Sequence, residues 1–185
     1  MRNALQVVRS YAQASLPPGP PRDASLAGME KSLQVMAGME LLLSPGALDP
    51  SPEEIARTLE LFPEFFVYEL RSRKIRLLVE RVDPPQGPFL FSAFPLLAAL
   101  LLGDLMAGGG GGAGEIRLSF QEGEFRLWWV PEPGTLPFPP LAQKPSRRAR
   151  ALAEGQGLQV ESLKEWTGFL VRAPLGGTRQ REVFP

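Results

Sequence analysis

Two carboxylates, a cluster of arginines and a run of glycines are the parts of this sequence whose residue types could take part in chemistry. The carboxylates are Asp104 and Glu132, the arginines lie within 147–150, and the glycines occupy 108–112. The chain has no histidine and no cysteine. This excludes imidazole bases, phosphohistidine, thiolate nucleophiles, disulfides and zinc sites of the Cys/His type.

Each of these features also has a purely structural interpretation. A phosphate-binding glycine loop ends in Gly-Lys-Ser/Thr and opens a helix, whereas the run at 108–112 lacks that ending and precedes an expected strand. We therefore expect a flexible connector there. The basic cluster of Arg147, Arg148 and Arg150 could bind an anion, but we interpret it as the solvated start of a helix. A lone carboxylate such as Asp104 is more often a solvated surface residue than a metal ligand.

Composition narrows the classes of partner. Twenty basic residues balance twenty acidic residues in a chain of 185, so no net charge favours nucleic acid or an anionic membrane. The first residues lack the apolar core of a secretory signal, and the longest apolar run, 89–107, is broken by Pro95, Gly103 and Asp104. We expect a cytoplasmic protein. Twenty prolines and no cysteine would suit a thermophile.

The first 48 residues carry two short apolar stripes at helical spacing. One helix is expected to end near Ser15 and a second to end before 43–46, separated by the rigid turn 17–21. These helices form an antiparallel hairpin that cannot bury both stripes alone. We expect two hairpins to pair in a four-helix bundle, and the alternative is that the hairpin folds back on the rest of its own chain. The predicted dimer interface consists of Leu5, Val8, Ala12, Leu26, Met29, Leu33 and Met36.

Residues 49–185 are expected to form a second domain of mixed α and β structure. Ser51 and Glu54 form a capping box that starts a helix, which extends to Leu70 with a kink at Pro63. The remaining elements follow as a strand at 75–82, a helix at 92–107, a hairpin of 116–120 and 125–130, a helix at 146–154, and strands at 158–163 and 169–173. This order predicts an α+β sandwich with helices on one face of a mixed sheet.

Residues 1–12, Met-Arg-Asn-Ala-Leu-Gln-Val-Val-Arg-Ser-Tyr-Ala, look like the segment H-E-L-R-N-P-L-x-x-I-x-x-Y-A entered at its third residue. That segment, together with the order of elements, resembles the sensor histidine kinases. The resemblance covers nearly the whole chain. It implies a dimerisation hairpin followed by the Bergerat-type ATP-binding domain that is also found in gyrase, and it places the phosphoacceptor histidine just before Met1.

The nucleotide-binding motifs of that family are altered in this chain. Residues 99–104, Ala-Leu-Leu-Leu-Gly-Asp, stand where the family has N-L-L-x-N-A, whose asparagine holds magnesium. Residues 130–136, Val-Pro-Glu-Pro-Gly-Thr-Leu, stand in place of the adenine-reading D-x-G-x-G, and residues 143–150 lack the G-x-G-x-G turn and are too short for an ATP lid. Residues 151–162 again resemble the family's closing strand region. The resemblance therefore implies a vestigial nucleotide face of Gly103, Asp104, Glu132 and Gly134.

These observations predict a non-catalytic dimeric signalling adaptor, with no enzyme activity, cofactor or metal. The resemblance implies that a response-regulator receiver domain docks on the hairpin, near Arg2 and Arg9, which lie seven residues apart on nearly one helical face. They could equally be ordinary solvated arginines. The alternatives are a nucleotide-binding sensor module without kinase activity, or a phosphotransfer protein if the true start lies upstream and supplies a histidine.

Overall fold

One mixed β-sheet organises the part of the chain that the computed structural model describes, namely residues 38, 40, 49–108, 114–132, 144–163 and 167–174. Its five strands lie in the order β1-β2-β3-β5-β4. Strands β1 and β2 are parallel, and the other neighbours are antiparallel. The strand bounds are β1 Ile75–Val82, β2 Gly114–Gln121, β3 Glu124–Pro131, β4 Gln159–Ser162 and β5 Gly168–Arg172.

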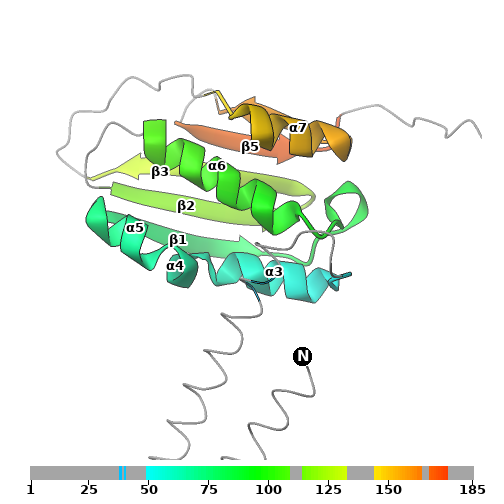
Figure 1. The fold of residues 1–185 in the computed structure, drawn as a ribbon, viewed down its shortest axis with the longest axis horizontal. Coiled ribbons are helices and arrows are strands. Elements are labelled where there is room, and N and C mark those ends of the chain that lie inside the picture. Colours follow the sequence, from blue (N-terminus) through cyan, green and yellow to red (C-terminus); the bar gives the residue numbers. More distant parts are fainter. Residues whose placement is uncertain are drawn as a thin grey trace, which may run out of the picture.

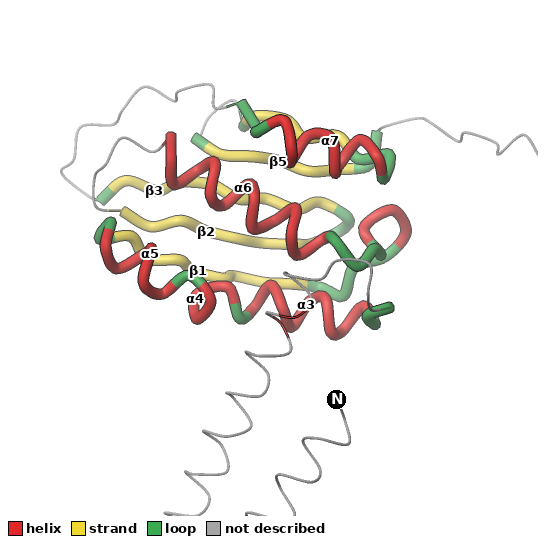
Figure 2. Tube along the Cα trace, viewed as in Figure 1, coloured by secondary structure: helices red, strands yellow, loops and turns green. Residues whose placement is uncertain are grey.

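All labelled helices cover one face of this sheet (Figure 1), and the tube view shows the same two layers (Figure 2). The predicted α+β sandwich is therefore confirmed for the described residues, because a sheet and a helical layer enclose a single core between them. The helix bounds are α3 Pro52–Glu60, α4 Phe62–Phe65, α5 Val67–Ser72, α6 Phe94–Gly108 and α7 Arg147–Gly155, with a 3₁₀ turn at Gly87–Phe89.

Helix α3 begins where its capping box predicts. The Glu54 amide donates to Ser51 Oγ at 3.2 Å, and the Ser51 amide donates to Glu54 Oε2 at 2.9 Å. The predicted single kinked helix is wrong: the chain forms three short helices, which meet at Leu61 and Phe66. Pro63 lies in the first turn of α4. Backbone amides in the first turn of a helix have no acceptor within the helix, so a proline there removes no helical hydrogen bond.

Helix α6 is the central element of the helical layer. Its sequence is almost wholly apolar, and side chains such as Leu97 and Leu101 have no exposed surface because the helix lies on the sheet between the flanking helices. Parallel strands β1 and β2 require a crossover between them, and α6 provides it. Its C-terminal end is fixed by Arg73, whose Nη1 donates to the Met106 carbonyl at 2.9 Å.

Local turn chemistry accounts for the hairpin, and close packing accounts for the last strand pair. Glu122 and Gly123 both have positive φ, at 52° and 74°, which is the geometry of a two-residue hairpin turn, and Gln121 pairs with Glu124 on either side of it. Strand β5 lies against β3 with Gly168 opposite Trp128. A Cβ atom on Gly168 would approach the Leu127 carbonyl oxygen to 2.3 Å, so glycine is needed for this pairing.

Most of the predicted hairpin, 1–48, lies outside the described residues. This includes Arg2, Arg9 and all seven residues of the predicted dimer interface. Gly38 and Glu40 are described, and both are helical. Gly38 is buried so closely against the second domain that an added Cβ atom would lie 2.5 Å from Phe65 Cζ. Within the described part of the chain, no helix has both the length and the apolar character to cross a membrane.

Candidate functional site

The start of helix α7 is joined to helix α6 by one hydrogen bond. The Ser146 amide donates to Asp104 Oδ2 at 2.7 Å, across 42 residues of sequence. Ser146 is the N-cap of α7, and its Oγ accepts a hydrogen bond from the Ala149 amide at 3.3 Å. A carboxylate from one helix and a hydroxyl from the other therefore satisfy amide groups at the same helix start.

The charge of Asp104 matters as much as its hydrogen bond. The N-terminal end of a helix carries a partial positive charge and attracts anions. The first turn of α7 contains no acidic residue and begins with the exposed residues Arg147 and Arg148, which add to that positive potential. Asp104 supplies a negative charge at this point, in the position where a bound phosphate would be stabilised by the same forces.

The structure brings together two of the four residues of the predicted vestigial nucleotide face. Gly103 and Asp104 are adjacent on α6 beside the start of α7, and Glu132 is an exposed residue just after β3. Gly134 lies outside the described residues. Asp104 is partly buried and hydrogen-bonded, so its interpretation as a solvated surface residue is wrong. Its contact with Ser146 depends on the packing of two helices distant in sequence, which no local pattern reveals.

A metal site is not apparent among the residues that the structure describes. No group of three or more histidine, cysteine, aspartate or glutamate side chains comes together there. A Cβ atom on Gly103 would meet no atom within 4 Å, so the position has room for a side chain. Glycine itself provides no side-chain amide there. At this end of α6 the carboxylate of Asp104 accepts a hydrogen bond from the amide at the start of α7.

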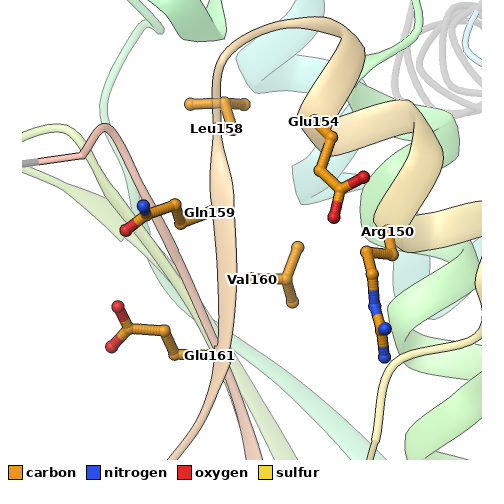
Figure 3. Close-up of a pocket in the computed structure, with 6 residues that line it drawn as sticks. All are labelled: Arg150, Glu154, Leu158, Gln159, Val160 and Glu161. Carbon is orange, nitrogen blue, oxygen red and sulfur yellow. The ribbon is translucent and has the colours of Figure 1, made fainter. Parts of the chain in front are cut away.

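A second feature of the described region is a hollow between α7 and strand β4, which the sequence did not indicate. Its volume is about 230 Å³, and it is lined by Arg150, Glu154, Leu158, Gln159, Val160 and Glu161. Figure 3 shows Arg150 and Glu154 projecting from the helix while Val160 points from the strand into the space between them. The opposite charges at 150 and 154 were visible in the sequence, but the edge position of β4 was not.

The face of the sheet opposite the helices has charges that largely neutralise one another. Arg117 donates to Glu115 at 2.8 Å and to Glu80 at 3.0 Å, and these hydrogen bonds, that to Glu115 foremost, raise the pKa of the Arg117 guanidinium. Arg172 forms a similar ion pair with Glu161 at 2.9 Å. Because these charges already have partners on the same sheet, this face offers less to a charged ligand than the hollow does.

Comparison with known proteins finds structural likenesses, two histidine kinases among them, and no match by sequence. No protein-family model matches the chain, and no curated protein matches it. The cytoplasmic segment of the histidine kinase QseC aligns at 14% identity and a TM-score of 0.45, covering 86% of this chain and 97% of QseC's. The Acinetobacter baumannii histidine kinase AdeS aligns at 12% identity and a TM-score of 0.46, covering 95% of each chain. Values this low establish neither a family nor an activity for the chain.

Replacement of Asp104 tests the contact between the two helices. We expect Asp104→Ala to lower the free energy of unfolding by about 0.5–2 kcal/mol, because the Ser146 amide loses its acceptor and the helix start loses a nearby negative charge. Urea denaturation would measure the change. The matched control is Asp104→Asn, which keeps an acceptor oxygen and should lose less. An Asp104→Ala protein as stable as the wild type would contradict the role assigned to this bond.

Proposed function

We propose that this chain is a non-catalytic dimeric signalling adaptor with the layout of a histidine kinase core. It acts by contact with other proteins and neither hydrolyses ATP nor transfers phosphate. The observation that carries the proposal is the bond between Asp104 and Ser146. The resemblance places a magnesium-binding asparagine at the position of Gly103 and a phosphate-binding turn at the start of α7, and here the neighbouring residue, Asp104, accepts a hydrogen bond from Ser146 at that helix start.

Two physical consequences of that bond argue against nucleotide as a ligand. A carboxylate at the start of α7 repels a phosphate group, and the Ser146 amide that would bind a phosphate already has an acceptor. Residue 103 is glycine, so it has no side-chain amide oxygen that could bind magnesium. A nucleotide-binding sensor would need Asp104 to move away, and a phosphotransfer protein would need a histidine that these 185 residues do not contain.

The proposed partner is a response-regulator receiver domain, and the proposed docking surface is the hairpin near Arg2 and Arg9. We propose that the hairpin also forms the homodimer through the apolar stripes predicted from the sequence. The buried position of Gly38 against Phe65 supports a close connection between the second hairpin helix and the domain that follows it.

A pull-down experiment tests the docking surface. Receiver-domain proteins should be recovered with the wild type and lost with an Arg2→Glu, Arg9→Glu double variant, because two attractive charges become repulsive. The matched control is Arg71→Glu, Arg76→Glu, which makes the same change of charge at two exposed positions of the second domain. Sedimentation must give the dimer mass for all three proteins, and a wild-type monomer would contradict the dimer. A partner set that survives the hairpin substitutions would instead direct attention to the surface near Glu132 and Arg147.

A further inference from the structure

Strand β4 forms one edge of the sheet, and the hydrogen-bonding groups of Val160 point away from the neighbouring strand. The Leu163 amide donates to the Gly168 carbonyl at 3.0 Å, which makes this a hydrogen-bonded pair of an antiparallel ladder. Such pairs alternate along the strands, so residues 159 and 161 also bond to β5. The amide and carbonyl of Val160 therefore face the outer side of β4.

The outer side of β4 is also where α7 presents two charged side chains. Arg150 and Glu154 are exposed, and neither side chain makes a hydrogen bond or an ion pair within the described part of the chain. They are four residues apart on α7, which is a rise of about 6 Å along the helix axis. Alternate residues of an extended strand are about 6.7 Å apart and point to the same side. The two charges thus match alternate side chains of a strand laid along β4.

We propose that the hollow between α7 and β4 binds an extended peptide segment of a partner protein, which joins the sheet as a strand antiparallel to β4. The segment carries an acidic side chain opposite Arg150 and a basic side chain two residues later opposite Glu154. This inference deepens the proposed adaptor function, on which it rests, by naming the form of a partner. The main-chain bonds to Val160 provide affinity, and the two charges select the sequence and its direction.

The direction of the bound segment along β4 follows from how α7 and β4 run relative to each other. Helix α7 and β4 run in opposite directions in Figure 3, with Glu154 beside Leu158 and Arg150 farther along β4. A strand antiparallel to β4 therefore passes Arg150 first and Glu154 second. Antiparallel pairing also continues the arrangement of β3, β5 and β4. The preferred order within the bound segment is acidic residue, any residue, basic residue.

Other occupants and other edges fit less well. The opposite edge strand, β1, has an irregular register between Val79 and Arg81, and such bulges hinder the addition of a strand. A second copy of this chain, paired through β4 around residue 161, would place Glu161 opposite itself, which is unfavourable. Paired around Val160, its β4 would direct no charged side chain toward α7 to meet Arg150 and Glu154. A heterologous peptide satisfies both charges.

Titration with short peptides tests the proposal on the full chain. The probe is a capped peptide of about seven residues with Glu-Thr-Lys at its centre and Thr and Val at the flanks. The controls are the same peptide with Lys-Thr-Glu and with Thr-Thr-Thr at the centre. Binding of Glu-Thr-Lys should slow amide hydrogen exchange at Val160 and be tighter than either control by about two- to fivefold for each exposed ion pair. Unchanged exchange at Val160, or tighter binding of Lys-Thr-Glu, would overturn the proposal.

Two variants separate the contribution of charge from that of the main chain. The double variant Arg150→Glu, Glu154→Arg keeps the net charge and should reverse the preference between the two charged peptides, by about tenfold overall. Val160→Pro removes the outward amide without breaking a bond to β5 and should abolish binding. If that protein does not fold, N-methylation of both the glutamate and the lysine of the peptide removes the partner of the Val160 carbonyl, whichever of the two residues lies opposite Val160, and should have the same effect. Retained binding after N-methylation would contradict strand addition.

The controls also distinguish this inference from the proposed function. Exchange protection at Val160 that rises with protein concentration, without peptide, would show pairing between copies and would refute a heterologous segment. The receiver-domain pull-down depends on the hairpin, whereas the peptide titration depends on β4. Each experiment can therefore fail while the other succeeds.

Discussion

Replacing Phe94 with alanine is expected to lower the free energy of unfolding by about 3–5 kcal/mol, the typical cost of removing a large buried aromatic side chain. Phe94 has no exposed surface and lies at the first turn of α6, between the helical layer and the sheet. Its ring centroid is 5.3–5.8 Å from those of four other rings, and three of these contacts are edge-to-face. The four rings belong to Phe89, Phe91, Phe120 and Phe125.

Chemical denaturation followed by circular dichroism would measure this loss. Tyr68 is the natural control, because its side chain is 87% exposed and Tyr68→Ala should change stability by no more than about 0.5 kcal/mol. Phe94→Leu is a second control, since it retains part of the buried volume and should cost less than alanine. A loss below about 1 kcal/mol for Phe94→Ala would contradict the placement of this ring at the centre of the core.

The sequence predicts the elements of the second domain well because their signals are local. The capping box at Ser51, the turn at Glu122 and Gly123, and the N-cap at Ser146 each fix an element end through residues no more than three positions away. The exception is the segment around Pro63, where the helix separates into short pieces at Leu61 and Phe66. Propensity does not reveal such a division, because packing of neighbouring aromatic rings helps to decide it.

The candidate site was less predictable, because it depends on long-range contacts. Gly103 and Asp104 were selected through a resemblance to nucleotide-binding motifs, and the structure gives Asp104 a different role, as an acceptor for the Ser146 amide. The position of β4 at the sheet edge follows from the insertion of β5 beside β3, which strand periodicity does not encode. The hollow beside Val160 could not be anticipated without that strand order. The dimer and the docking surface at Arg2 and Arg9 remain predictions.

Calorimetric titration with a nonhydrolysable ATP analogue and magnesium is the most direct test of the central claim that this protein acts without nucleotide. The wild type should give no saturable heat up to about 1 mM analogue, a limit that corresponds to binding weaker than about −4 kcal/mol. The physical reason is that the carboxylate of Asp104 occupies the start of α7, where a phosphate would have to bind. Incubation with labelled ATP should likewise leave no label on the protein, since it contains no histidine to accept a phosphoryl group. A micromolar dissociation constant for the analogue, or acid-labile label on the chain, would contradict the account.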